Sequence, residues 1–130
     1  MGTSALQWSD EMSVGHPVLD EQHQLLVDLA NRVKTLFGTD ARAAIDAAFE
    51  EIVKYTIHHF KFEENVLRAA KYPGLNGHKK IHKKISDSVD DLYAHRDTVT
   101  PEQLYSTLYD VIIKHILVDD IKFKDILSAR

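Results

Sequence analysis

Residues 45–70 read IDAAFEEIVKYTIHHFKFEENVLRAA, and this stretch decides the fold class. One set of positions recurs in it at spacings of four and three residues, which is the period of one face of an α-helix. The members of this stripe are Ile45, Phe49, Ile52, Thr56, His59, Glu63, Val66 and Ala70. Because the stripe is apolar at both ends, we predict a long amphipathic helix whose seam turns inward and which ends at the Tyr-Pro-Gly of residues 72–74.

The segments on either side carry the same helical period. Upstream, a seam runs through residues 18–37 and stops at Gly38, and either Thr39 or Asp40 can cap the helix that follows. The positions on this first seam are Leu19, His23, Leu26, Ala30, Val33 and Phe37. Downstream, a third helix is predicted from about Asn76, and its seam positions are His78, His82, Ile85, Val89 and Leu92.

A fourth helix begins with a strong start signal. Thr100 is placed to cap it, Pro101 takes the first helical position, and Gln103 closes a capping box. Its seam continues through Leu104, Leu108, Val111 and His115. Short connections between four long helices make each helix an antiparallel neighbour of the last. We therefore predict an all-α, up-down-up-down antiparallel four-helix bundle that forms one domain over residues 1–130, with an extended N-terminal arm over 1–17 and a short C-terminal helical segment.

Composition narrows the classes of protein. A chain of 130 residues with 44% hydrophobic and 28% charged residues is expected to be a soluble globular domain without a membrane span. The net charge of −4 argues against nucleic-acid binding, and the lysines within residues 79–84 alternate with seam positions, as on a solvated helix face. The absence of cysteine excludes disulfides, iron-sulfur clusters and thiolate zinc sites. The N-terminus carries no signal-peptide pattern, so a cytoplasmic location is expected.

Polar groups interrupt all four apolar seams. Burying one unpartnered polar group costs about 1–3 kcal/mol, and several together would consume most of a domain's net stability of about 5–15 kcal/mol, so something must compensate. Two pairs, His59 with Glu63 and His78 with His82, are four residues apart and project from one helix face as chelating pairs. The candidate metal ligands are His23, His59, Glu63, His78, His82, His115 and Asp120. Three other histidines fall off the seams and are expected to face solvent, namely His16, His58 and His95.

The number and type of these ligands predict two metal ions rather than one. Imidazole suits zinc, copper, iron and nickel, but seven ligands exceed the four of a closed zinc site. Two irons offer about twelve coordination positions, of which five histidines, two bridging carboxylates and an oxygen bridge fill about eleven. About one position stays open on a redox metal inside an apolar core. Reversible binding of a small ligand requires such an open position.

Four segments of the chain resemble the hemerythrin family, particularly its single-domain bacterial members. They are LDEQH at 19–23, HFKFEE at 59–64, HKKIH at 78–82 and HILVDD at 115–120, in family order over nearly the whole chain. The resemblance implies two iron ions bridged by an oxo or hydroxo group. It also implies the ligands of each iron: His78, His82 and His115 for one, His23 and His59 for the other, with Glu63 and Asp120 as bridges.

The same resemblance implies which carboxylate binds and where oxygen is held. Asp120 is preferred to Asp119 because the family's carboxylate stands five residues after its histidine. The second iron, bound by His23 and His59, would hold oxygen. Residues next to the ligands would form the oxygen pocket, and these are Leu26, Phe60, Ile112 and Ile116.

Reversible dioxygen binding at a non-haem diiron centre is therefore the predicted function, as an oxygen carrier, buffer or delivery protein. Ferritin-like diiron enzymes use four carboxylates and paired Glu-x-x-His motifs, and no Glu-x-x-His occurs in this chain. Five neutral imidazoles also stabilise high-valent iron less than a carboxylate-rich set does, so no enzymatic activity is expected. The alternatives left open are oxygen or redox sensing through a separate signalling partner, iron storage, and diiron oxidase or peroxidase activity; an oxygen-consuming enzyme is a further candidate partner.

Overall fold

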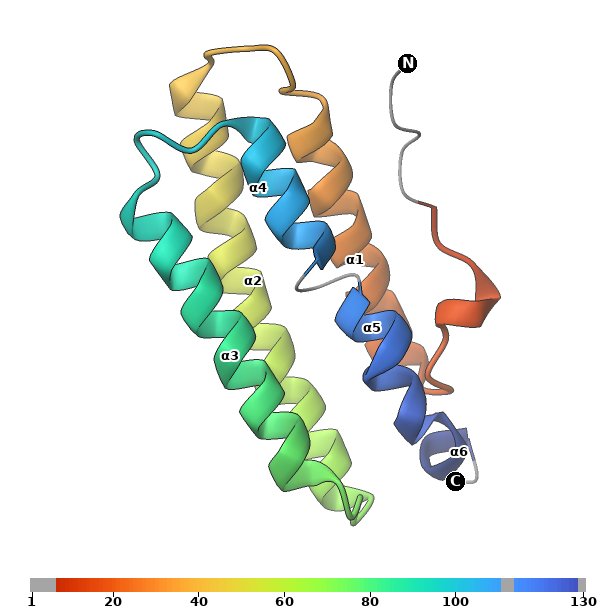
Figure 1. Ribbon diagram of the computed structural model, residues 1–130. Helices are drawn as coiled ribbons and strands as arrows, with labels where there is room; N and C mark the ends of the chain where they lie inside the picture. Colours follow the sequence, from red (N-terminus) through yellow and green to blue (C-terminus); the bar gives the residue numbers. More distant parts are fainter. Residues whose placement is uncertain (1–6, 111–113, 129–130) are drawn as a thin grey trace.

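The predicted seams form helices that lie side by side in the computed structural model, which describes residues 7–110 and 114–128 (Figure 1). The elements are the 3-10 helix η1 (Asp10–Met12), α1 (Pro17–Lys34), α2 (Arg42–Ala69), α3 (Leu75–Ala94), α4 (Pro101–Leu108), α5 (Lys114–Val118), the 3-10 helix η3 (Asp120–Phe123) and α6 (Lys124–Ser128). Neither described range contains a strand, so the all-α prediction is confirmed.

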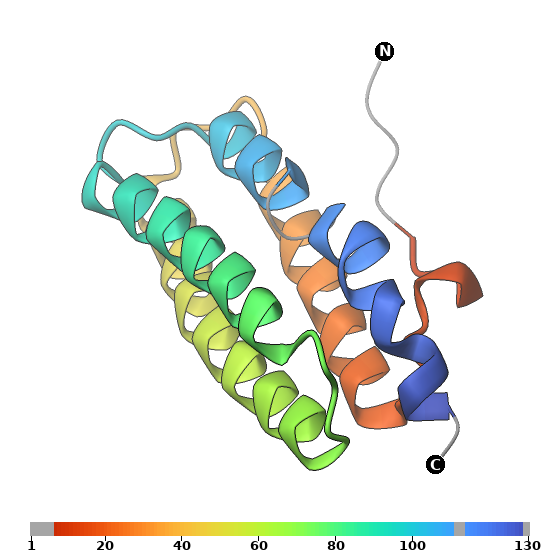
Figure 2. The same cartoon turned by 60° about the horizontal axis from the view of Figure 1, so that its bottom comes forward.

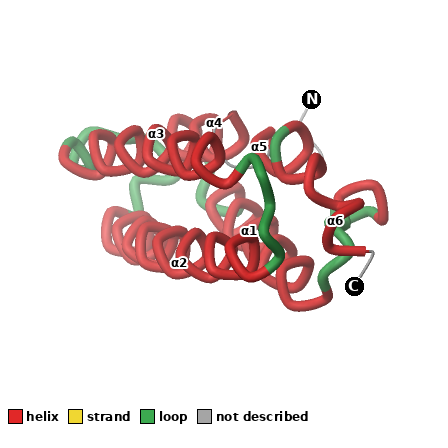
Figure 3. The backbone as a smooth tube through the Cα atoms, turned by 90° about the horizontal axis from the view of Figure 1, so that it is seen from below, coloured by secondary structure: helices red, strands yellow, loops and turns green. Residues whose placement is uncertain are grey.

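The helices pack in the order in which the chain presents them. α1 lies against α2, α2 against α3, and α4 returns beside α1, while α5 follows α4 along the fourth column of the bundle (Figures 1 and 2). Seen along the bundle, α1 and α2 form one layer and α3 with α4 and α5 forms the other (Figure 3). The up-down-up-down four-helix bundle is thus confirmed, and η3 and α6 supply the predicted C-terminal helical segment.

The predicted fourth helix is described on both sides of residues 111–113. It is described in two parts, α4 and α5, and the predicted seam residue Val111 lies outside the described residues. The capping box at its start is confirmed: the Gln103 N–H donates to Thr100 Oγ1 at 3.1 Å, and the Thr100 N–H donates to Gln103 Oε1 at 2.9 Å. This reciprocal pair satisfies two N–H groups that a helix start leaves without partners.

The connection between α1 and α2 corrects two predicted details. α1 ends at Lys34 rather than near Phe37, and the turn that follows closes at Gly38, whose positive φ of 77° suits glycine. Neither Thr39 nor Asp40 caps α2, because the cap position is occupied by Ala41. The Thr39 hydroxyl instead donates to the Leu36 carbonyl at 2.7 Å, so it closes the preceding turn.

The predicted N-terminal arm is described from residue 7 onward and is not uniformly extended, since η1 interrupts it. The Asp20 carboxylate fixes the arm to α1 by accepting hydrogen bonds from Ser13 Oγ at 2.6 Å and from the Val14 N–H at 2.8 Å. Trp8 is half-buried and packs against the core. Within residues 7–110 and 114–128, no helix combines the length and apolar character that a membrane span requires.

Two apolar clusters form the core, and the polar seam residues lie between them. Leu19 on α1 and Leu67 on α2 belong to the cluster that contains Phe123, whereas Leu26 and Phe60 belong to the larger cluster toward α4. His23 therefore lies between Leu19 and Leu26 along α1. The bundle presents a dry polar layer bounded by hydrophobic side chains on both sides.

Candidate metal centre

Four elements and a 3-10 turn deliver the seven predicted ligands to one layer. α1 supplies one histidine, α2 a histidine and a glutamate, α3 two histidines, α5 one histidine, and η3 one aspartate. All are buried, with exposed fractions between 0% and 5%; they are His23, His59, Glu63, His78, His82, His115 and Asp120. Five helical segments thus converge on a cluster of imidazoles and carboxylates that water does not reach.

The cluster divides into two groups that share both carboxylates. In each group, the potential ligand atoms all lie within 4.8 Å of one another. The three-histidine group consists of His78, His82 and His115 with Glu63 and Asp120. The two-histidine group consists of His23 and His59 with the same Glu63 and Asp120. These are the two sets of histidines that the family resemblance implied, and the structure brings the members of each set together.

Glu63 turns one oxygen toward each group. Its Oε1 lies 2.7 Å from Nε2 of His78 and 3.0 Å from Nε2 of His82. Its Oε2 lies 3.2 Å from Nε2 of His23 and 3.4 Å from Nε2 of His59. A carboxylate so placed is suited to bridge two cations, because each of its oxygens faces a different set of imidazoles.

Asp120 repeats this division from the opposite side. Its Oδ1 lies 2.9 Å from Nε2 of both His78 and His115, and its Oδ2 lies 3.2 Å from Nε2 of His23. Asp119, the other candidate, is not in the cluster. Its Oδ2 instead lies 2.9 Å from Nδ1 of His115, on the side of the ring that faces away from Asp120.

Several buried polar atoms at the centre have close neighbours but no hydrogen bond within the described residues. They are Nε2 of His82, Nε2 of His115 and both carboxylate oxygens of Asp120. His115 Nε2 is only 2.9 Å from Asp120 Oδ1, so the angles rather than the distances exclude a hydrogen bond. Nitrogen and oxygen atoms that crowd together without bonding to one another are arranged to meet a common cation, and this ligand set fits metal ions.

Without a metal, protons on the imidazoles must balance the carboxylates. Burial alone would lower the pKa of His23 and of His78, but their close contacts with the Asp120 and Glu63 carboxylates outweigh it and raise each pKa to about 9. The pKa of His115 is raised as well, chiefly because its close contact with the Asp120 carboxylate outweighs burial. Both carboxylates are held in their charged form by these imidazoles.

The pKa values of His59 and of the two carboxylates are lowered rather than raised. Burial lowers the pKa of His59, and its contact with Glu63 does not compensate. The pKa of Glu63 is well below its ordinary value, since close contacts with four histidines outweigh the cost of burial. The pKa of Asp120 is lowered in the same manner by His115, His23 and His78. The lowered pKa values favour the charged form of Glu63 and Asp120 and the neutral form of His59. These three side chains can therefore bind a cation without first losing a proton.

Three polar side chains around the cluster were not predicted as part of it. Gln22 Oε1 accepts from Nδ1 of His59 at 2.7 Å, Glu64 Oε2 accepts from Nδ1 of His82 at 2.8 Å, and Asp119 Oδ2 accepts from Nδ1 of His115 at 2.9 Å. We call these three residues, Gln22, Glu64 and Asp119, the outer partners. By holding the proton on Nδ1, each leaves Nε2 of its imidazole free to bind a metal.

Only one of the three outer partners could be inferred from spacing in the sequence. Asp119 stands four residues after His115, so the two share a helix face. Gln22 and Glu64 instead reach histidines on neighbouring helices, from α1 to α2 and from α2 to α3, and no spacing within one helix reports such a contact.

The residues predicted for the oxygen pocket are apolar and buried where they are described. Leu26, Phe60 and Ile116 are at most 5% exposed and belong to one core cluster, whereas Ile112 lies outside the described residues. The Phe60 ring stacks on the imidazole of His82, with centroids 3.8 Å apart and planes 6° from parallel. Phe60 therefore fixes the orientation of one ligand ring.

The histidines predicted to face solvent lie outside the cluster. His58 and His95 are exposed. His16 is half-buried rather than exposed, because it caps α1: its Nδ1 accepts from the Leu19 N–H at 3.3 Å.

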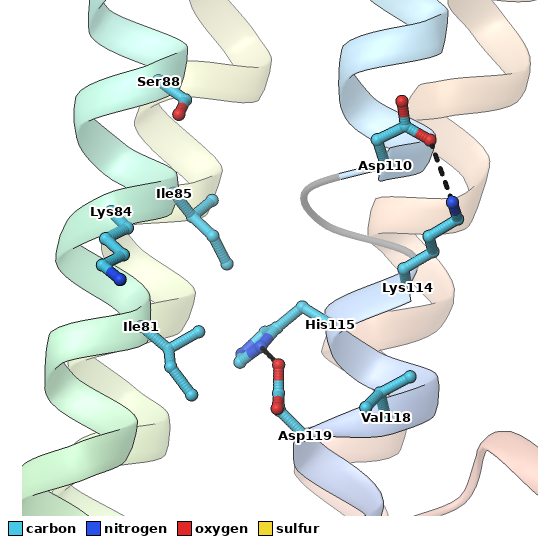
Figure 4. A pocket seen from close by; sticks show the side chains of 9 residues that line it. All are labelled: Ile81, Lys84, Ile85, Ser88, Asp110, Lys114, His115, Val118 and Asp119. Atoms are coloured by element: carbon cyan, nitrogen blue, oxygen red, sulfur yellow. Dashed lines mark hydrogen bonds and ion pairs between the residues drawn. The ribbon is translucent and has the colours of Figure 1, made fainter.

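A surface hollow of about 350 Å³ between α3 and α5 reaches the edge of this layer (Figure 4). Ile81 and Ile85 line it from α3, and His115 and Asp119 close it on the other side. The hydrogen bond between His115 and Asp119 therefore joins two residues that line this hollow.

Comparisons with known proteins relate the whole chain to one family. Residues 14–127 match the family model described as the Hemerythrin HHE cation binding domain. The chain is similar to a bacteriohemerythrin of Stenotrophomonas maltophilia, with 30% identity over 96% of this chain and 83% of the relative. It is also similar to a bacteriohemerythrin of Pseudomonas aeruginosa, with 32% identity over 92% of this chain and 80% of the relative. A myohemerythrin of Theromyzon tessulatum is 31% identical over 91% of this chain and 90% of its own length.

Solved structures match the fold. A crystal structure of wild-type hemerythrin superposes with a TM-score of 0.88, covering 96% of this chain and 99% of that one, at 23% identity. At that identity the match supports the four-helix bundle.

Proposed function

This chain belongs to the hemerythrin family, which is known for oxygen binding, and we propose that it binds dioxygen reversibly at two iron ions held by its seven buried ligands. One iron would be bound by His78, His82 and His115, and the other by His23 and His59. Glu63 and Asp120 would bridge the two, together with an oxo or hydroxo group. A pair of irons supplies the two electrons that reversible capture of dioxygen draws on.

One observation carries the proposal. Glu63 and Asp120 each divide their two oxygens between the three-histidine and the two-histidine groups. A site for a single metal does not require carboxylates that turn one oxygen toward each of two histidine groups. Two adjacent metals do require such bridging anions. The unequal number of imidazoles leaves the two-histidine position with fewer protein ligands, so an open position belongs there.

The rest of the layer favours binding over catalysis. The shared carboxylates are the two anions in direct reach of both groups, so little negative charge is available to stabilise high-valent iron. Leu26, Phe60 and Ile116 exclude water from the adjoining core, which withholds protons and competing ligands from a bound small molecule. We infer that the protein is an oxygen-binding protein rather than an enzyme, and that dioxygen is its principal ligand.

A reversibility experiment tests the proposal. Iron-loaded protein is reduced without oxygen, exposed to air while its visible spectrum is recorded, and then freed of oxygen. We expect about two irons per chain and a visible band that forms in air and disappears when oxygen is removed. Permanent bleaching, steady consumption of added reductant, or one zinc and no iron after iron loading would each contradict the proposal.

A further inference from the structure

The outer partners divide unequally between the two groups of histidines. In the three-histidine group, His82 and His115 each donate to a carboxylate, from Glu64 and Asp119. In the two-histidine group, His59 donates to the neutral amide of Gln22. The remaining histidine of that group, His23, has a buried Nδ1 with no hydrogen-bond partner among the described residues.

This division creates a charge difference that the ligands themselves do not contain. Glu63 and Asp120 are common to both groups, so they do not distinguish one from the other. The outer partners distinguish the two groups. Two carboxylates accept hydrogen bonds from imidazoles of the three-histidine group, whereas no outer carboxylate among the described residues does so in the two-histidine group. A carboxylate that accepts from Nδ1 makes Nε2 a stronger donor to a metal, whereas an amide does so much less.

We propose that Gln22 keeps the two-histidine position the more electrophilic of the two, by giving His59 a neutral partner where His82 and His115 have anionic ones. This inference rests on the proposed function and adds the residue that sets the difference between its two positions. An electron-poor metal with fewer imidazoles binds a small anionic ligand more tightly and is itself held less tightly by the protein. Gln22 is thus a positioning residue that acts through His59.

Gln22 is well placed for this role because it bonds to His59 on one side and lines a surface hollow on the other. It is 9% exposed and lines a hollow of about 400 Å³ between α1 and α2. The charged residues of that hollow, Glu21 and Asp28, are exposed, so solvent screens them. Only Gln22 among these residues has a hydrogen bond to a ligand imidazole.

A pair of variants separates the charge of the partner from its position. Gln22→Glu keeps an oxygen acceptor for His59 and adds a negative charge, while Gln24→Glu adds the same charge to the same hollow on an exposed side chain. Glu64→Gln makes the reverse change in the three-histidine group. Gln22→Leu removes the acceptor and serves if the glutamate variant folds poorly, which circular dichroism of the metal-free protein would show.

Cobalt(II) titration followed by calorimetry is the first measurement. We expect the wild-type chain to bind two cobalt ions in a tight and a weaker step. Gln22→Glu should tighten the weaker step by about tenfold, Glu64→Gln should loosen the tight step by about tenfold, and Gln22→Leu should loosen the weaker step. Gln24→Glu should leave both steps unchanged.

Azide binding to the oxidised, iron-loaded protein is the second measurement, with the reduction potential as a third. Gln22→Glu should weaken azide binding by about tenfold and lower the potential, whereas Gln24→Glu should change neither. Equal behaviour of these two variants would overturn the inference. Fewer than two cobalt ions in the wild-type chain would overturn both the inference and the diiron proposal. The expected cobalt and azide results without reversible oxygenation would contradict the proposed function alone.

Discussion

At the scale of single residues, Glu63 is the carboxylate that contacts four of the five clustered histidines. It is fully buried, and its two oxygens lie within 3.4 Å of four imidazoles from α1, α2 and α3. Its position could be predicted from the sequence, since it lies four residues after His59 on the seam of one helix. Its division between two groups of histidines could not, because that depends on how three helices pack.

Replacing Glu63 should therefore prevent assembly of the two-metal centre. Glu63→Ala removes the one α2 carboxylate that both groups share, so iron content should fall from about two per chain to one or fewer, as measured by elemental analysis after loading. His58→Ala is the matched control, since His58 is exposed and lies one residue from His59. Equal iron content in the two variants would contradict the ligand assignment.

Ile116 tests the apolar wall beside the centre. It is 1% exposed and follows His115 directly, so Ile116→Ala should open space in the core and cost about 2–5 kcal/mol of unfolding free energy. The iron content should stay at its full value, and the oxygenated form should decay faster, as timed by stopped-flow absorbance. Leu117→Ala is the control, because Leu117 is 42% exposed. An unchanged decay rate in Ile116→Ala would remove this residue from the pocket.

At the scale of helices, the sequence predicts seams better than ends. Alternating steps of three and four residues identify the inward face of α2 from Ile45 to Glu63, because burial imposes that period. Near the end of the helix the predicted Val66 is only half-buried, and Leu67 takes the buried position instead. Helix ends depend on where a polar side chain finds its partner. Thr100 and Gln103 bond to each other, so their prediction was correct, whereas Thr39 bonds to the Leu36 carbonyl and its prediction as a cap of α2 was wrong.

The outer partners were not predicted for the same reason, since their roles also depend on which partner a polar side chain finds. Gln22 and Glu64 are adjacent in sequence to ligands but bond to histidines of other helices, so their role appears only when the helices are in place. A side chain's contact across an interface is a property of packing, and the helical period says only which face it occupies.

Thr100 and Thr39 together test the account of helix ends. Thr100→Ala removes an acceptor for the Gln103 N–H and should lower the free energy of unfolding by about 1 kcal/mol. Thr39→Ala loses only an exposed hydroxyl bond to a turn carbonyl, so its effect should stay within about 0.5 kcal/mol. Urea unfolding of the metal-free protein measures both. A larger loss in Thr39→Ala would show that Thr39 supports α2 after all.

At the scale of the whole molecule, the buried layer links folding to protons and metal. In the metal-free protein, imidazolium groups pair with Glu63 and Asp120 between two apolar clusters. A metal takes the place of those protons, so folding, protonation and metal binding share the same side chains. The number of polar groups on the seams predicts such a link, but the direction of each pKa shift depends on distances that only the structure provides.

The last prediction follows from the signs of those shifts. The pKa of His23 and of His78 is raised from 6.5 to about 9 by folding, so the stability they contribute is fully present below pH 6.5 and is lost as the pH rises through about 9. The lowered pKa of Glu63 and of Asp120 acts at the other end: its contribution is present above about pH 4 and is lost on acidification. The metal-free protein should therefore lose stability both in acid and as the pH rises from about 6.5 to about 9.

Metal-loaded protein should behave differently at the alkaline end, because a bound cation replaces the protons that the imidazoles lose. The difference in melting temperature between loaded and metal-free protein should grow as the pH rises from about 6.5 to about 9 and then level off. Preloaded zinc protein and chelator-treated protein, melted in parallel across this range, provide the measurement. Zinc binding near pH 7.5 should also release protons, and the number released should fall as the starting pH approaches 9, which calorimetry in buffers of different ionisation enthalpy would detect. A melting difference that stays constant or shrinks over this range would show that His23 and His78 do not exchange protons for metal, and that their contacts with the carboxylates serve the fold alone.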